Sequence, residues 1–332
     1  MPMSAKPLLT AAVALLSFAH FSGLARAEEK AARGPTASLS RSIKYKSTPE
    51  GDLHLNMFWP EGHKVSDKRP VIVLFFGGGW VAGKPQQMAG HARYFARAGY
   101  VGISAKYRVR NKDGGHLTPY DCVEDGKSAV RYLREHAEEL GIDPDKIIAG
   151  GGSAGGHVAA CSGVIKGYDA KNENAKISSV PNAMVLFNPV IDTTDKGYGS
   201  DKFTPKTQTE LSPCHHVRAG LPPTYIVHGT ADKTVPFENV QRFDRLMREA
   251  GNVCKLLAFE GRGHGFFNVP GFKKGTKEDF AAIMQGATAF LAEQGLAPKA
   301  TETEAAETEA TETEEGQGKC TTPRQKGAAG AD

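Results

Sequence analysis

The chain has 332 residues, of which 40% are hydrophobic and 23% are charged, so it is long and apolar enough to bury a sizeable core. The formal net charge of +4 hides an asymmetry, because residues 301–332 carry eight acidic and three basic residues while the remainder is mildly basic. The lysines and arginines form no dense block, which argues against a nucleic-acid-binding surface.

The first 27 residues have the pattern of an export signal. A weakly positive start at Lys6 precedes a mostly apolar stretch over 8–21, and Ala25-Arg26-Ala27 fits the small-x-small rule for cleavage. Polar residues near the end of the stretch disfavour an uncleaved membrane anchor, so we expect no stable membrane insertion after cleavage. The sequence has no Asn-x-Ser/Thr sequon, which hints at a bacterial cell. We predict an exported protein, periplasmic or extracellular.

Five cysteines are an odd number for an exported chain, so at most two internal pairs can form, and Cys320 in the tail is the expected leftover. The cysteines do not form a CxxC pair, which leaves little support for a redox or zinc-ribbon site. Adjacent ligands rarely converge on one ion, so we interpret Cys214-His215-His216 as loop residues. The sequence therefore predicts no cofactor and no metal.

After a lead-in over 28–40 that we expect to be disordered, the chain begins with a hairpin signal. Residues 42–46 and 53–59 alternate between apolar and polar, and Gly51-Asp52 fits the turn. Residues 70–76 are continuously apolar, which predicts a strand buried on both faces of a parallel sheet.

Helices and strands then alternate. We predict helices over 86–98, 120–140, 154–165, 237–250 and 280–291, and strands over 100–105, 146–150, 183–187, 224–227 and 253–259. Gly141 is expected to cap the second of these helices. This order indicates βαβ units and a mostly parallel sheet of about eight strands with helices on both faces, in one α/β domain over 41–297.

Two segments depart from this alternation. Residues 191–221 are polar and without a clear period, and two interpretations stay open, a small cap or lip over the site and an ordinary long surface loop. Residues 298–332 form a Thr/Glu-rich acidic tail without large apolar residues from position 300 onward, which we expect to be disordered because it cannot offset its ordering entropy by burial.

The segment Gly151-Gly152-Ser153-Ala154-Gly155 is the centre of the predicted chemistry. An apolar run leads into this glycine-flanked serine and a helix-compatible run follows it, which is the layout of a nucleophile elbow. Glycines on both sides of Ser153 allow the strand and the helix to approach each other across a sharp turn.

Three further features lie directly after predicted strands, which is where a serine hydrolase of this architecture has its catalytic groups. The glycines at 77–79 follow the strand at 70–76, and loop N–H groups of this kind can stabilise a developing oxyanion. Asp232 and His264 follow the last two strands, so Ser153, Asp232 and His264 occur in the order expected of an α/β-hydrolase triad. In that mechanism His264 takes the proton of Ser153, and Asp232 orients the imidazole and stabilises its cation.

From about residue 40 to 295 the chain resembles the α/β-hydrolases of the hormone-sensitive-lipase-like esterase group and the related secreted carbohydrate esterases of the acetyl-xylan and feruloyl types. The shared motifs are Gly-Gly-Gly-Trp, Lys106-Tyr107-Arg108, Gly-Gly-Ser-Ala-Gly-Gly and His-Gly-x-x-Asp-x-x-Val-Pro. The resemblance implies an α/β-hydrolase fold, a catalytic triad and an oxyanion hole. The triad would be Ser153, Asp232 and His264, and the oxyanion donors would be Gly77, Gly78 and Ala154.

One residue departs from the family pattern. The family usually has a histidine before the three glycines, which supports the loop, and this chain has Phe76. Among the other polar residues, we interpret His157 and His228 as structural, and Asp121 and Asp125 as acids that favour a helix N-terminus.

These features predict a secreted serine carboxylic-ester hydrolase that removes short acyl groups, such as acetate, from carbohydrate or small esters. Its partner would be a small-molecule or polysaccharide ester, and the polysaccharide part rests on family analogy. Two alternatives stay open, a feruloyl or lipid-type esterase of the same fold and a non-catalytic binding protein. The sequence leaves the oligomeric state open.

Overall fold

The computed structural model describes residues 41–110 and 117–299. The predicted signal at 1–27, the lead-in at 28–40 and all but the first two residues of the tail at 298–332 lie outside the described residues. The elements described below belong to Met1–Ala297, the first of the two units into which the chain divides.

An eight-stranded sheet forms the centre of this unit, in the order β1-β2-β4-β3-β5-β6-β7-β8. Six neighbouring strands run parallel, whereas β1 pairs antiparallel with β2, and β2 antiparallel with β4. This confirms the predicted mostly parallel sheet, and the hairpin predicted at 42–59 forms its antiparallel edge. The strands are β1 (Arg41–Thr48), β2 (Gly51–Phe58), β3 (Arg69–Phe75), β4 (Val101–Ala105), β5 (Ile142–Gly152), β6 (Ala183–Phe187), β7 (Thr224–Gly229) and β8 (Cys254–Phe259).

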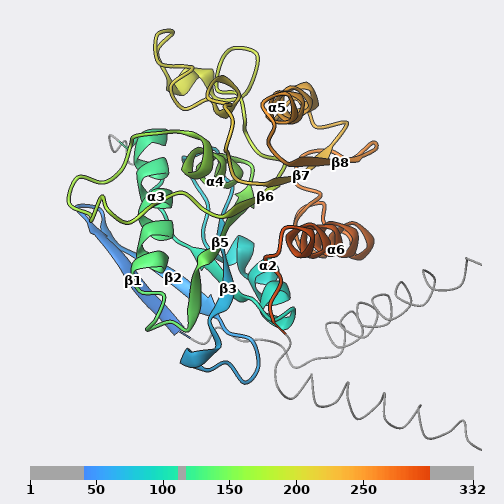
Figure 1. Cartoon of the computed structure of the whole chain (residues 1–332). Coiled ribbons are helices and arrows are strands. Elements are labelled where there is room, and N and C mark those ends of the chain that lie inside the picture. Colours follow the sequence, from blue (N-terminus) through green and yellow to red (C-terminus); the bar gives the residue numbers. More distant parts are fainter. Residues whose placement is uncertain (1–40, 111–116, 300–332) are drawn as a thin grey trace, which may run out of the picture. The chain divides into compact units, whose positions relative to one another are not determined.

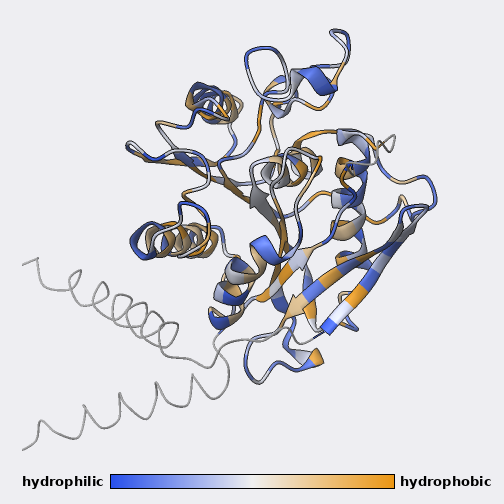
Figure 2. Cartoon of the chain, turned by 180° about the vertical axis from the view of Figure 1, so that it is seen from behind, coloured by the Kyte–Doolittle hydropathy of each residue, from blue (hydrophilic) through white to orange (hydrophobic). Residues whose placement is uncertain are grey.

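Helices cover both faces of the sheet. Figure 1 shows α3, α4 and α5 on one side and α2 and α6 on the other. Most helices mix hydrophobic and hydrophilic residues, as expected where one helix face packs on the sheet (Figure 2), whereas α4 is buried at every position. Strand β3 is buried at every position, as its continuous apolar run predicted. The helices are α2 (Gln86–Arg97), α3 (Pro119–Glu135), α4 (Ala154–Val164), α5 (Phe237–Glu249) and α6 (Lys277–Glu293).

Several predicted boundaries are wrong. The strand predicted over 146–150 is longer, β5 over Ile142–Gly152, and the helix predicted over 280–291 begins three residues earlier, at Lys277. Thr48 pairs with Gly51, so the hairpin turn is Pro49-Glu50 rather than Gly51-Asp52. Helix α3 ends at Glu135, and hydrogen-bonded turns continue to Gly141, which has a φ of 62°. Buried side chains persist along these turns, and a burial pattern alone cannot distinguish a turn from the last part of a helix.

A buried ion pair explains the Lys106-Tyr107-Arg108 motif. The fully buried Asp125 of α3 accepts hydrogen bonds from the backbone N, Nε and Nη2 of Arg108 at 2.9, 2.8 and 2.8 Å, and Lys46 Nζ lies 2.8 Å from its carboxylate. Asp121 caps α3 by accepting a hydrogen bond from the Thr118 N–H at 2.7 Å. Neither acid contacts Ser153 through these bonds. Asp121 lies in the first turn of α3 as expected, whereas the expectation for Asp125 is wrong, because it lies beyond that turn and pairs with Arg108 instead of stabilising the helix N-terminus.

The four described cysteines, Cys122, Cys161, Cys214 and Cys254, are free thiols, and the first three are buried. Within the same part of the chain, the helices are too short or too polar for any of them to cross a membrane.

The ion pair of Asp125 predicts a stability effect. Replacing Asp125 with Ala removes the main partner of the partly buried Arg108, which keeps only Glu124 at 2.9 Å as a close partner, so we expect the free energy of unfolding to fall by about 2–3 kcal/mol. Denaturant unfolding measures this change. The control is Glu249→Ala, which removes the exposed partner of Arg245 at 3.3 Å and should cost less than about 0.5 kcal/mol. Equal losses in the two variants would contradict the assignment.

Candidate active site

Ser153 lies at the sharp turn between β5 and α4. Its φ of 56° and ψ of −120° are outside the regions that side chains ordinarily permit, which is the strained geometry expected of a nucleophile elbow. The turn is held by hydrogen bonds from the Ser153 N–H to Phe187 O at 2.9 Å and from the His157 N–H to Ser153 O at 3.0 Å. A Cβ at Gly155 would lie 2.1 Å from Phe75 O, so only glycine fits there.

The structure brings the three predicted triad residues together. His264 Nε2 lies 3.0 Å from Ser153 Oγ, and His264 Nδ1 lies 2.7 Å from Asp232 Oδ2. An ionised carboxylate can only accept, so Nδ1 carries the proton and Nε2 is left to accept the Ser153 hydroxyl. Such a chain prepares a serine for attack on an electrophilic carbon, with histidine as the base.

Asp232 is a buried acceptor with several donors. Its Oδ1 accepts from the N–H groups of Thr234 and Val235 at 2.8 and 3.0 Å, and its Oδ2 also accepts from Asn188 Nδ2 at 2.7 Å. Burial by itself would raise the pKa of Asp232, but hydrogen bonds from His228, His264 and Asn188 outweigh it and hold the pKa well below its usual value. Asp232 therefore stays ionised at neutral pH.

Two further residues belong to the site, Asn188, which was not predicted from the sequence, and His228, which was predicted only as structural. Asn188 follows β6, has a φ of 41°, and is fully buried. His228 Nε2 lies 3.0 Å from Val235 O and 3.3 Å from Asp232 Oδ2, so it supports the loop that carries the carboxylate. Asn188 lies at the carboxyl end of the strand beside β7, and this position is the signal that could have identified it.

The glycine loop lies directly against the nucleophile, because a Cβ on Gly77 would lie 3.1 Å from Ser153 Cβ. The Gly77 N–H, however, donates to Gln87 Oε1 at 2.8 Å, so this predicted oxyanion donor is already occupied. In the described part of the chain, the loop N–H groups of Gly78 and Gly79 have no acceptor. Ala154 is the first residue of α4, where the N–H has no intrahelical acceptor.

Phe76 stands where the family usually has a histidine that supports the glycine loop, and in this chain the loop is supported by other contacts. The Phe76 ring stacks on Tyr107, with centroids 4.3 Å apart and an interplanar angle of 21°. The Tyr107 hydroxyl donates to Phe76 O at 2.7 Å. The backbone before the glycines is therefore fixed from the Lys106-Tyr107-Arg108 segment.

His157 of α4 joins that helix to the glycine loop and to the segment 191–221. Its Nδ1 accepts from Trp80 Nε1 at 3.2 Å, and its Nε2 donates to Leu211 O at 2.7 Å. The ring centroids of Trp80 and Tyr198 in turn lie 5.7 Å apart. The segment 191–221 is thereby packed against the glycine loop, and the structural interpretation of His157 agrees with these contacts.

No metal arrangement is found among residues 41–110 and 117–299, where no three His, Cys, Asp or Glu side chains are grouped to hold an ion. In the Cys214-His215-His216 segment, His215 Nδ1 faces Ser212 Oγ at 2.8 Å and His216 Nε2 faces Thr209 O at 2.9 Å. These side chains face protein groups rather than a common point.

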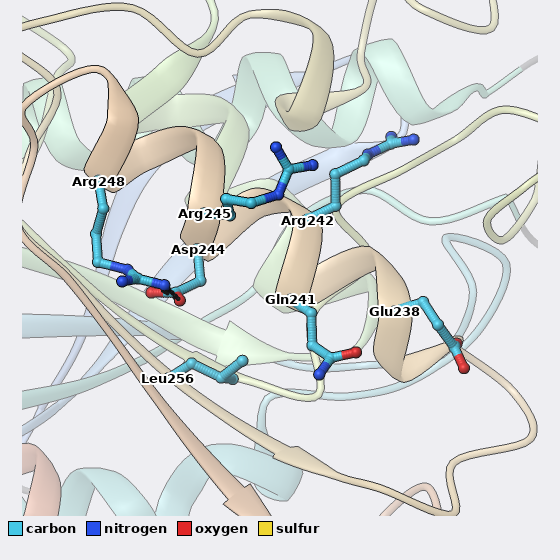
Figure 3. A pocket seen from close by; sticks show the side chains of 7 residues that line it. All are labelled: Glu238, Gln241, Arg242, Asp244, Arg245, Arg248 and Leu256. Atoms are coloured by element: carbon cyan, nitrogen blue, oxygen red, sulfur yellow. Dashed lines mark hydrogen bonds and ion pairs between the residues drawn. The ribbon is translucent and has the colours of Figure 1, made fainter.

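Two surface hollows lie elsewhere, and neither is lined by Ser153, Asp232 or His264. One of about 530 Å³ lies between α5 and β8, where Figure 3 shows Arg248 paired with Asp244, 2.8 Å apart. The other, of about 300 Å³, contains Lys127, whose Nζ donates to Ile165 O at 2.9 Å. Most of their charged groups have protein partners and neither hollow contains a triad residue, so we assign neither to the reaction.

Comparison with known proteins gives relatives that are esterases. Residues 55–247 match the family BD-FAE. The chain is 26% identical over 247 residues to a probable isoprenylcysteine alpha-carbonyl methylesterase of Arabidopsis thaliana, covering 68% of this chain and 50% of that protein. It is 28% identical to carboxylesterase NlhH of Mycobacterium tuberculosis, covering 72% and 80%. The match to the plant methylesterase thus spans about half of that relative's length.

Solved structures give a closer match. The apo form of Thermogutta terrifontis esterase 2 superposes with a TM-score of 0.74 at 42% identity, covering 81% of this chain and 99% of that chain. The same esterase has been solved phosphorylated by paraoxon, at 42% identity and a TM-score of 0.73, with the same coverage of both chains. These similarities establish the α/β-hydrolase fold predicted from the sequence.

The buried histidines predict an acid-sensitive stability. Burial lowers the pKa of His157 from 6.5 to about 4, with a smaller opposing effect from its bond to Leu211 O. Between pH 6.5 and 4 the unfolded chain therefore binds a proton that the folded chain does not, and the free energy of unfolding falls as the pH falls. From pH 7 to 5 we expect His157 to account for a loss of about 2 kcal/mol.

Denaturant unfolding at pH 7 and pH 5 tests this. His157→Gln lacks the titrating group, so the difference in stability between wild type and this variant should narrow by that amount at the lower pH. Ser162→Ala on the same helix provides the matched control, because it removes a buried hydrogen bond to Val158 O without removing a titrating group, and it should follow the wild-type pH dependence. A constant difference between wild type and His157→Gln would contradict the prediction.

Proposed function

Because this chain belongs to the BD-FAE family and to the hormone-sensitive-lipase-like esterase group of the α/β-hydrolases, we propose that it is a serine carboxylic-ester hydrolase. The observation that carries the proposal is the hydrogen-bond chain from Asp232 through His264 to Ser153, at 2.7 and 3.0 Å. A binding protein without catalysis has no use for this arrangement at a strained turn.

In the proposed reaction, Ser153 Oγ attacks the ester carbonyl carbon while its proton passes to His264 Nε2. The oxyanion that forms accepts hydrogen bonds from the N–H groups of Gly78, Gly79 and Ala154, each worth on the order of 3 kcal/mol in the transition state. We replace Gly77 by Gly79 in this set because the Gly77 N–H is bound to Gln87.

The tetrahedral intermediate then collapses, and His264 returns the proton to the departing alcohol. Water attacks the remaining acyl-enzyme, with His264 again accepting a proton, and the acid is released from Ser153. Throughout, Asp232 remains a carboxylate and stabilises the imidazolium, because the hydrogen bonds to it hold its pKa well below its usual value.

We further propose short acyl groups as substrates. Thermogutta terrifontis esterase 2 has been solved with propionate bound, at 41% identity, and with butyrate bound, at 42% identity. These bound carboxylates of three and four carbons support a pocket for short acyl groups, of two to four carbons, in this chain. Carbohydrate or a small alcohol as the other half of the ester, and export through residues 1–27, rest on the sequence patterns described above.

The central test is replacement of the nucleophile. Ser153→Ala should lower hydrolysis of nitrophenyl acetate by about 10⁴-fold or more, because the acyl-enzyme can no longer form. The matched control is Ser162→Ala on the same helix, whose hydroxyl donates to Val158 O at 2.9 Å and should be dispensable for the reaction. Paraoxon should inactivate wild type and leave a phosphoryl group on Ser153, detected by mass spectrometry of the peptide. Activity retained in Ser153→Ala would refute the mechanism.

Acyl length is tested with nitrophenyl esters of two to twelve carbons. We expect kcat/KM to be greatest at two to four carbons and to decline with longer chains, since a short pocket cannot enclose them. An optimum at eight carbons or more would overturn the short-acyl proposal and favour a lipid-type esterase. Turnover of a feruloyl ester with none of these substrates accepted would assign the feruloyl alternative.

A further inference from the structure

The glycine loop and the loop of His264 are joined by two side-chain amides. We propose that Gln87 and Asn268 are positioning residues that hold the oxyanion loop and the base in fixed relation to each other. This inference rests on the proposed function, because it assigns these residues a role in the same reaction. Neither residue contacts the substrate in this proposal.

The hydrogen bonds form a continuous path. The Gly77 N–H donates to Gln87 Oε1 at 2.8 Å, and Gln87 Nε2 donates to Asn268 Oδ1 at 3.0 Å. Asn268 Nδ2 then donates to Gly265 O at 2.7 Å, and Gly265 is the neighbour of His264. The path connects backbone groups on both loops through residues 181 positions apart in the sequence.

The orientation of both amides follows from the ends of the path. A backbone N–H can only donate, so the Gln87 oxygen faces Gly77, and a carbonyl can only accept, so the Asn268 nitrogen faces Gly265. The remaining Gln87 nitrogen and Asn268 oxygen are complementary. Reversing either amide would oppose two like groups, so the path has one consistent arrangement.

Packing around the path leaves little freedom to the His264 loop. Asn268 is fully buried, and His91 Nε2, one helical turn after Gln87 on α2, donates to the neighbouring Phe267 O at 2.9 Å. A Cβ on Gly152 would lie 2.4 Å from the Phe267 ring, so this loop also packs against the elbow. One face of α2 therefore supports both loops.

The position of Gly77 explains why this support affects the reaction. Fixing the Gly77 N–H sets the plane of its peptide, and the following N–H groups at Gly78 and Gly79 take their directions from it. Because Phe76 replaces the usual histidine, we infer that Gln87 supplies polar support from the other side of the loop. A displacement of about 1 Å between catalytic groups can cost about 100-fold in rate.

The experiment compares Gln87→Met, Asn268→Leu and the double variant. Losing either amide should lower kcat by about 10- to 100-fold with KM little changed, since the lost contribution acts on the transition state. If the two amides act as one unit, the double variant should be no worse than the poorer single variant. Gln86→Met, at the exposed neighbouring glutamine, is the matched control and should retain wild-type kcat.

Gln87→Glu separates the two halves of the path. Its carboxylate still accepts from the Gly77 N–H but cannot donate to Asn268 Oδ1. We expect the Gly77 amide to remain protected from hydrogen exchange in this variant, while kcat falls. In Gln87→Met both the protection and kcat should be lost, with the melting temperature close to that of wild type because Gln87 is only partly buried.

The outcomes distinguish the two proposals. Absence of Ser153-dependent hydrolysis in wild type would refute the esterase assignment, whereas amide exchange still decides the hydrogen-bond path. Equal hydrogen exchange of the Gly77 amide in wild type and in Gln87→Met would overturn the proposed hydrogen-bond path. So would wild-type kcat in Gln87→Met, additive losses in the double variant, or a raised KM with unchanged kcat, which would indicate substrate contact instead.

Discussion

The backbone strain at Ser153 is the constraint on which the rest of the site depends. A non-glycine residue at this φ costs about 1–3 kcal/mol and persists only where the surroundings enforce it. Here the enforcement comes from β6, whose Phe187 O binds the Ser153 N–H, and from close contact between the elbow and β3. The strain points the hydroxyl out of the sheet edge, where residues after other strands can reach it.

Electrostatics then determine what the hydroxyl can do. The carboxylate of Asp232 is buried, yet five donors keep it ionised, two backbone N–H groups and the side chains of Asn188, His228 and His264. Removing a charge from water is costly unless such partners replace the water. The donors therefore serve two purposes, since they stabilise the folded loop after β7 and provide a fixed negative charge facing His264.

The sequence was most informative where chemistry follows topology. Ser153, Asp232 and His264 each follow a strand of a parallel sheet, whose carboxyl ends share one edge, so their order alone was enough to predict their proximity. The occupied Gly77 N–H could not be predicted, because it depends on the side-chain direction of Gln87 on the next helix. Asn268 was missed for the same reason, whereas Asn188 could have been identified from its place directly after β6 at the same sheet edge. The end of α3 was misplaced because buried residues continue through the turns after it.

The Gln87–Asn268 path and the segment 191–221 are attached to different helices. These attachments suggest how substrate preference and reactivity can vary separately. The path through Gln87 and Asn268 joins the reacting groups to α2, on one face of the sheet. Segment 191–221 is instead held to α4 on the opposite face through the His157 bond to Leu211 O, and it touches the glycine loop through the contact of Trp80 with Tyr198. Because these attachments share no side chain, residues of the segment other than Tyr198, which lies beside Gly79, can change without a direct effect on Gln87 or Asn268. A fold arranged in this way can alter the groups beside its glycine loop while the distance from Ser153 to His264 stays constant.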